Sequence, residues 1–273
     1  VPDEAPVITQ RKSSVETGNT ITINAAENAT ANVTISDVNI NTSDAAVSTN
    51  GKGNVNIELD GTNTLQSGRN YAGLEKSNDG KMTITDENEN GKLIATGGNY
   101  GAGIGGGDSD NGSNITITGG DITATGGDCG AGIGGGFSAG GKNITIAGGK
   151  VTAIGGTNGA GIGGGLRNNG EKITVSGDAT LKVQGGPTDT WDGAGAGIGN
   201  GGNHNGEFSG SFIPVNGAET EPDTSNLTTG KIEYYAPGAD MTKDKPTSTT
   251  LGSRQPEPAS PGETAAPVEY RMQ

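Results

Sequence analysis

Short stretches of the chain alternate polar and apolar residues with a period of two. The pattern occurs six times, and each copy places two aliphatic side chains on one face. Such alternation is typical of a β-strand with one buried face, and no run with helical spacing interrupts the series. The copies are residues 32–36, 54–58, 81–85, 114–118, 143–147 and 172–176.

A glycine-rich heptapeptide recurs in step with these stretches. Gly-Ala-Gly-Ile-Gly-Gly-Gly occupies residues 101–107, 130–136 and 159–165, with a step of 29 residues. A looser copy at 195–201 follows after 36 residues, because residues 187–193 are inserted before it. A fixed period of this size is the signature of a solenoid.

Within one period, residues 114–142, three short strands are predicted at 114–118, 121–125 and 130–133, with paired glycines at the corners. Parallel strands of successive periods would then stack on one another. We therefore predict an all-β fold: a single-chain right-handed parallel β-helix of about six coils with three short strands per coil.

Aliphatic residues at equivalent positions should stack into inward-facing rows, which suits a narrow solenoid core. The first predicted row is Val33, Val55, Met82, Ile115, Ile144 and Ile173. The second row is Ile35, Ile57, Ile84, Ile117, Ile146 and Val175. The third row is Ile104, Ile133, Ile162 and Ile198, with Leu74 from a degenerate copy of the heptapeptide.

Composition shifts divide the chain into four parts. Residues 1–18 are predicted to be a leader, extended or strand-donating, and 19–207 the β-helix. Residues 208–236 carry most of the aromatic residues after the repeat, and they are predicted to cap the open core. Residues 237–273 are rich in Pro, Thr and Ser, which predicts a linker or tail.

Charge and composition limit the possible partners. The chain has 273 residues, 53 of them Gly, and a net charge of −14. This charge disfavours nucleic acid and anionic membrane surfaces, which need clusters of Lys and Arg. No apolar stretch is long enough to insert into a membrane. The single cysteine, Cys129, excludes an internal disulfide and is interpreted as a small packed residue.

Two segments, 54–65 and 72–75, together with the Ala-Thr-Gly-Gly and heptapeptide repeats, carry a family resemblance. Over about residues 19–203, the chain resembles Gly-rich β-helix surface proteins of Gram-positive gut bacteria, which are described as carbohydrate-binding-domain-containing or adhesin-like. The resemblance implies a bacterial protein that is secreted or attached to the cell surface. It transfers no catalytic residue, because the shared motif contains none.

Aromatic residues near breaks in the repeat are the candidate carbohydrate ligands. Tyr71 and Tyr100 lie one coil apart and one position out of register, so we expect neighbours and not a strict stack. Trp191 and Asp192 lie in the inserted segment 187–193. Insertions in solenoids often carry the binding face, and aromatic rings cover sugar rings well.

One loop partly resembles a calcium-binding loop. Asp108 and Asp110 stand at alternate positions before a glycine, but the distal bidentate Glu is missing. The equivalent loops of the next two coils lack the paired Asp. Calcium at Asp108 and Asp110 is the one cofactor that the sequence suggests.

The sequence favours a noncatalytic adhesin-like module that binds a glycan or a cell-surface polysaccharide. The alternative is a fibre subunit that self-associates by end-to-end stacking, or by strand donation from 1–20 or 268–272. A third hypothesis is a polysaccharide lyase or glycoside hydrolase, whose candidate acids are Asp121, Asp128, Asp178, Asp189 and Asp192. Asp121 aligns with Lys150 one coil later, so no row of acids persists. The lone His204 is interpreted as a loop residue.

Overall fold

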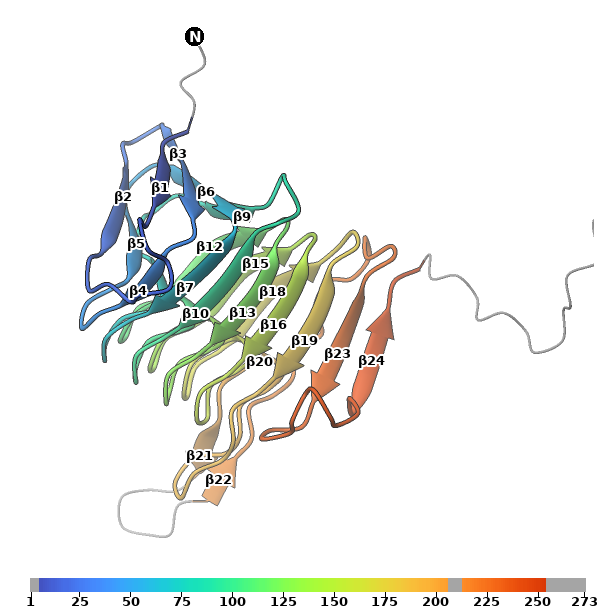
Figure 1. Ribbon diagram of the computed structural model, residues 1–273. Helices are drawn as coiled ribbons and strands as arrows, with labels where there is room; N and C mark the ends of the chain where they lie inside the picture. Colours follow the sequence, from blue (N-terminus) through green and yellow to red (C-terminus); the bar gives the residue numbers. More distant parts are fainter. Residues whose placement is uncertain (1–4, 206–212, 254–273) are drawn as a thin grey trace, which may run out of the picture.

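The computed structural model describes residues 5–205 and 213–253, and it shows three sheets wound into a rod (Figure 1). Within these residues the strands run through the sheets in a repeating order, and no helix occurs. Six consecutive coils, from β2 to β19, each place one strand in every sheet. The predicted fold class, with about six coils and three strands per coil, is confirmed.

Sheets A and B form the two broad walls of the rod. Sheet A contains β1 (Val7–Thr9), β3 (Thr30–Ser36), β6 (Asn54–Asp60), β9 (Met82–Thr85), β12 (Gly112–Ile117), β15 (Gly141–Ile146) and β18 (Gly170–Val175). Sheet B contains β4 (Asn39–Asn41), β7 (Thr62–Gln66), β10 (Lys92–Thr96), β13 (Asp121–Thr125), β16 (Lys150–Ile154), β19 (Thr180–Gln184), β23 (Lys231–Tyr235) and β24 (Ser248–Leu251).

Sheet C is the third wall, and its later strands are only two residues long. It contains β2 (Ile21–Ala25), β5 (Val47–Gly51), β8 (Leu74–Lys76), β11 (Ile104–Gly105), β14 (Ile133–Gly134), β17 (Ile162–Gly163) and β20 (Ile198–Gly199). A separate antiparallel hairpin, β21 (Asn203–Asn205) and β22 (Ile213–Val215), projects from the side of the rod (Figure 1).

The core consists of stacked aliphatic rows, and the third predicted row, from Leu74 to Ile198, is confirmed. The first two rows are confirmed from the second coil onward. The first coil differs by two residues, because Val33 pairs with Ile57 and Ile35 with Leu59. A shift of two keeps the same side chains facing inward, so alternation alone does not fix the register of this pair.

From β11 onward, the heptapeptide forms the narrow third wall. In each copy the alanine N–H donates to the carbonyl of the sixth residue, as from Ala131 to Gly135 at 2.9 Å. The fifth residue, for example Gly134, has a φ of 141°, a conformation that favours glycine. The heptapeptide therefore closes into a tight U whose isoleucine points into the core.

The coils approach one another too closely for side chains at some positions of this wall. A Cβ at Gly132 would lie 2.6 Å from the carbonyl oxygen of Gly161 and 2.6 Å from the amide nitrogen of Ile154. Both atoms belong to the backbone, so neither can rotate away. The glycines are therefore required by the packing of coil on coil.

The C-terminal end is closed by a segment that we call the strap, residues 217–228. Asp223 bridges to the last strand of sheet A, and Thr220 donates its N–H to Ile198 in sheet C at 2.8 Å. The Glu219 carboxylate accepts the N–H groups of Gly197 and Ile198 at 2.7 and 3.0 Å. In earlier coils the equivalent N–H groups donate to carbonyls of the next coil. The Glu219 carboxylate therefore takes the place of the carbonyl acceptors that a further coil would supply.

Sheet B continues beyond the six coils. β23 adds in parallel to β19, and β24 adds antiparallel to β23. The paired sheet therefore extends past residue 236, where the cap was predicted to end and the tail to begin. The aromatic part of the predicted cap at 208–212, most of the predicted tail and the strand donor 268–272 lie outside the described residues.

The predicted leader packs on the opposite end. β1 pairs in parallel with β3, and Thr17 forms a bridge with Ile40 of β4, so the leader covers sheets A and B. The part of the chain that the structure describes has no helix that could cross a membrane.

Candidate functional site

The two arms of each heptapeptide U bring distant residues together along one corner of the rod. The residue before one copy accepts a backbone hydrogen bond from the residue after the next copy. The pairs are Asn70 with Asp108 (2.7 Å), Tyr100 with Phe137 (2.8 Å), Cys129 with Leu166 (2.9 Å) and Asn158 with Gly202 (2.6 Å). We call this line of residues, with the adjoining Arg69, Tyr71, Arg167 and the inserted segment 187–193, the corner ridge.

Tyr100 is the centre of a small aromatic and cationic cluster on this ridge. Its ring lies 5.3 Å from that of Phe137, at an interplanar angle of 50°. The guanidinium carbon of Arg69 lies 4.9 Å from the Tyr100 ring centre, and Arg69 Nη2 is 2.9 Å from the Tyr100 hydroxyl oxygen. This hydrogen bond raises the pKa of Arg69 further. Tyr100 is half-buried and held in one orientation.

Tyr71 lies one coil earlier on the same ridge, and its side chain is 36% exposed. A Cβ at Gly101 would lie 2.0 Å from the Tyr71 carbonyl oxygen, so Tyr71 stacks on Gly101 and not on Tyr100. This matches the predicted offset of one position. The backbone thus places the two tyrosines as near neighbours along the corner.

The inserted segment is anchored to the ridge by a buried carboxylate. Asp192 is 2% exposed, and its two oxygens accept hydrogen bonds from Arg167 Nε and Nη2 at 2.9 and 2.7 Å. His204 Nδ1 of β21 lies 2.7 Å from Asp192 Oδ1. The prediction that Asp192 contacts a sugar directly does not fit this arrangement, because the carboxylate is enclosed by its own chain.

Electrostatics stabilise the ionised form of Asp192. Burial raises the pKa of this carboxyl, but the hydrogen bonds and charges of Arg167 and His204 outweigh burial and hold the pKa below its ordinary value of 3.8. Asn158 adds to the anchor from within the core, donating from Nδ2 to the carbonyls of Asp192 and Gly193 at 2.9 and 2.8 Å. The base of the insertion is therefore fixed at three points.

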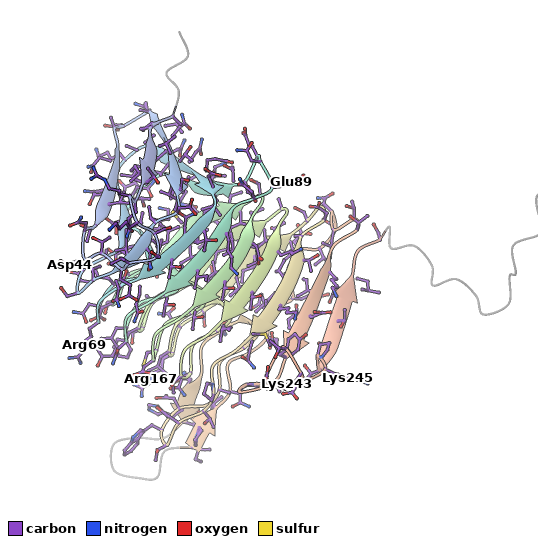
Figure 2. All side chains as sticks on the ribbon, viewed as in Figure 1. Asp44, Arg69, Glu89, Arg167, Lys243 and Lys245 are labelled. Atoms are coloured by element: carbon purple, nitrogen blue, oxygen red, sulfur yellow. The ribbon has the colours of Figure 1, made fainter. Side chains whose placement is uncertain are left out.

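Trp191 is adjacent to this anchor and has the opposite environment. The residue is 54% exposed, and its backbone N–H donates to Asp189 Oδ1 at 2.8 Å. The segment thus holds a large aromatic ring at the surface while its neighbour is buried. Arg69 and Arg167 lie along the same edge of the rod, and Glu89 lies on the opposite edge (Figure 2).

Exposed large apolar side chains are confined to few places in the described chain. Tyr71 and Trp191 lie on the corner ridge, and Ile213 lies in the adjoining hairpin. The others are at the ends of the rod: Val7 and Val15 in the leader and Leu251 in the last strand. An apolar side chain exposed on a polar surface is the usual mark of a contact region.

Within the described residues, no third His, Cys, Asp or Glu side chain joins Asp108 and Asp110 of the predicted calcium loop. Asp108 Oδ1 accepts a hydrogen bond from Ser109 at 3.1 Å. In the ranges that the structure describes, no group of three or more His, Cys, Asp or Glu side chains is placed to hold a metal ion. Calcium prefers six to eight oxygen ligands, so binding at Asp108 and Asp110 stays a prediction.

Cys129 lies on the ridge but is not an activated thiol. Burial, then the nearby Asp128, Asp189 and Asp192, raises the pKa of Cys129 to about 11, an effect that Arg167 only partly opposes. The thiolate is the nucleophilic form. Cys129 therefore stays protonated at neutral pH.

A groove lies at the corner between sheets A and B. This groove of about 680 Å³ is lined by Asp86, Glu89, Asp121 and Asp178, with Lys92 and Lys150 beside them. Asp121 pairs with Lys150 in the next coil, as predicted from the sequence, and with Lys92 in the previous coil. Among the predicted catalytic acids, Asp121 and Asp178 share this groove. Asp189 and Asp192 belong to the corner ridge, and Asp128 precedes Cys129 of the ridge.

Three segments of the chain, residues 89–108, 115–137 and 144–166, match the beta helix repeat family. Each segment covers most of one coil of the observed rod. Together with the stacked parallel strands, the matches define the chain as a parallel β-helix protein. No curated protein and no solved structure matches the chain.

Sequence reasoning missed several residues of the ridge, among them Arg69, Phe137, Leu166 and Arg167. A signal for Phe137 and Leu166 was present, because each directly follows a heptapeptide, as Asp108 does. The backbone N–H of each therefore donates to the carbonyl of the residue that precedes the previous copy of the heptapeptide. No sequence pattern indicates Arg69 or Arg167, because their contacts with Tyr100 and Asp192 depend on the conformations of long side chains.

Proposed function

We propose that this chain is a noncatalytic, extracellular surface module of the adhesin type that binds carbohydrate along the corner ridge. The observation that carries the proposal is the placement of exposed or half-buried aromatic rings on this one edge. Tyr71, Tyr100 and Trp191 follow the edge, and Phe137 and Arg69 support the middle ring. The resemblance to surface proteins with carbohydrate-binding labels supports the same proposal.

The chemistry of the ridge suits a sugar chain. Aromatic faces pack against the C–H faces of sugar rings, and nearby amides and charged groups can bond to hydroxyls. Asn99 and Asp128 are exposed beside Tyr100 and Cys129, with Asn99 Nδ2 3.4 Å from Asp128 Oδ2. An extended ridge favours an oligosaccharide or polysaccharide over a single sugar, since the rings are spread over several coils.

The proposal assigns different roles to the two residues of the insertion that the sequence suggested. Trp191 contacts the ligand, whereas Asp192 positions the segment through Arg167 and His204. Substitution of either residue should weaken binding. Only the Asp192 substitution should also lower the stability of the folded chain, because only Asp192 is buried.

The direct experiment is a glycan array probed with the wild-type chain and with Trp191→Ala. We expect binding to one class of glycan, and a loss of about tenfold or more in affinity for that glycan on substitution. Leu251→Ala is a matched control, since Leu251 is similarly exposed but lies at the end of the rod. Absence of any glycan ligand, or equal binding by Trp191→Ala, would contradict the proposal.

A polysaccharide lyase or glycoside hydrolase is the second candidate, and the groove between sheets A and B favours it. Paired carboxylates beside lysines can supply acid–base chemistry to a glycosidic bond. Incubation of the chain with a panel of polysaccharides, followed by reducing-end and unsaturated-product assays, tests this candidate. Cleavage that Asp121→Asn abolishes and Trp191→Ala leaves intact would place catalysis in the groove and replace the noncatalytic proposal.

A further inference from the structure

The two ends of the rod are built differently, although the coils between them are alike. At the C-terminal end the strap covers the last strands of sheets A and C. At the N-terminal end the leader covers sheets A and B, and within the described residues β2 has no strand on its outer side. β1, β2 and β4 lie at one end of the rod, and β23 and β24 lie at the other (Figure 1).

The N-terminal end contains an apolar pocket with a mainly basic rim. The pocket, about 580 Å³, lies between the leader and the first coil. Its apolar lining consists of Ile8, Val15, Ile21, Val38 and Ile40. Arg11 and Lys12 are exposed on the rim, and neither forms an ion pair with another described residue. The one acid there, Glu16, accepts a hydrogen bond from Asn41.

The C-terminal end contains a pocket of similar size with an acidic rim. This pocket, about 690 Å³, lies between the strap and the strands β23 and β24. Pro222, Tyr234 and Pro237 give it apolar walls, and Glu219 and Glu221 line its edge. Tyr234 packs near Gly197, where a Cβ would lie 3.0 Å from the tyrosine ring. Both carboxylate side chains belong to exposed residues.

We propose that a second copy of this chain docks head to tail, with the N-terminal end of one rod on the C-terminal pocket of the next. Arg11 and Lys12 of one copy then face Glu219 and Glu221 of the other. Val15, which is 57% exposed, packs against the Tyr234 and Pro222 walls. Charge complementarity selects this pairing, because it leaves neither two basic ends nor two acidic ends in contact.

The contact is heterologous, so a docked pair keeps one free N-terminal end on one copy and one free C-terminal end on the other. Because the two surfaces lie at opposite ends of a rod, repetition gives an open filament and not a closed ring. The strap closes sheets A and C at the C-terminal end, so the junction depends on side chains and not on continued strand pairing in those sheets. The corner ridge remains on the side of every copy. The inference does not depend on glycan binding.

The experiment uses two variants with reversed charge at opposite ends. The head variant is Arg11→Glu/Lys12→Glu, and the tail variant is Glu221→Lys/Ser248→Lys. Ser248 is exposed at the C-terminal pocket, and Glu219 is retained because it caps the last coil. Sedimentation velocity over a concentration series and negative-stain electron microscopy measure assembly, and circular dichroism confirms that both variants are folded.

We expect the wild-type chain to form end-to-end oligomers that dissociate at high salt, and each variant alone to lose at least about tenfold in association constant. An equimolar mixture of the two variants should assemble again in alternating order. The acidic head of the head variant then faces the basic tail of the tail variant, and the unchanged basic head of the tail variant faces the unchanged acidic tail of the head variant. A wild-type chain that stays monomeric at all concentrations would overturn the proposal. Oligomers unaffected by either variant, or variants whose mixture does not reassemble, would overturn it as well.

Discussion

The heptapeptide wall and the corner ridge are made by the same repeat, yet they follow opposite rules. Inside the heptapeptide, atoms of successive coils lie so close that Gly132 has no space for a methyl group. At its two flanks the backbone pairing is kept, but the side chains change from coil to coil: Tyr100, Cys129 and Asn158 before the copies, Phe137 and Leu166 after them. Packing of coil on coil therefore restricts which residue types the wall can contain, whereas residue type can vary from coil to coil on the ridge.

The largest effect should come from breaking the wall. Gly132→Ala places a Cβ 2.6 Å from the carbonyl oxygen of Gly161 in the next coil and 2.6 Å from the amide nitrogen of Ile154, so the backbone must move apart. We expect a loss of about 3 kcal/mol in the free energy of unfolding, at the upper end for overpacking. Urea denaturation measures it. Gly18→Ala is the control, since nothing lies within 4 Å of that position, and it should be neutral.

The next effect concerns the anchor of the ridge. Asp192→Asn keeps the shape of the side chain but removes the charge that pairs with Arg167 and His204. We expect a loss of about 2 kcal/mol, less than for a fully buried pair, because the Arg167 side chain is 42% exposed. Asp128→Asn is the exposed control. Equal stability of these two variants would show that Asp192 does not anchor the insertion.

A pH series sharpens the same assignment. The folded pKa of Asp192 lies below its ordinary value of 3.8, so its contribution to stability is complete above that value and is lost as pH falls through the folded pKa. The difference in unfolding free energy between the wild type and Asp192→Asn should therefore shrink as pH falls below about pH 4. A difference that does not shrink between about pH 4 and about pH 2 would contradict the ion-paired arrangement.

The smallest effect should come from Tyr100→Phe. This substitution keeps the ring on Phe137 and removes only the hydroxyl that accepts a hydrogen bond from Arg69. We expect no measurable change in thermal stability and a decrease of less than about tenfold in glycan affinity, because one hydrogen bond is lost and the ring is kept. Tyr100→Ala should weaken binding further. Titration calorimetry with the glycan found on the array distinguishes the two variants.

The sequence predicted the coil architecture because the heptapeptide and the alternating strands share one period. It could not fix the register of Val33, because a shift by two residues leaves the inward face unchanged. It located the insertion by its length and its Trp, but it assigned Asp192 to the surface. Burial of that carboxylate depends on Arg167 and His204, which lie 25 and 12 residues away in sequence. No local pattern marks such a contact.

The central claim is that ligand recognition lies where the repeat is broken. Amide hydrogen exchange of the whole chain, with and without the array-identified glycan, tests it most directly. We predict slower exchange in the segments around Tyr71 and Tyr100 and in residues 187–193, with no change along the faces of sheets A and B. Protection confined to the groove between sheets A and B, with none on the corner ridge, would contradict the account.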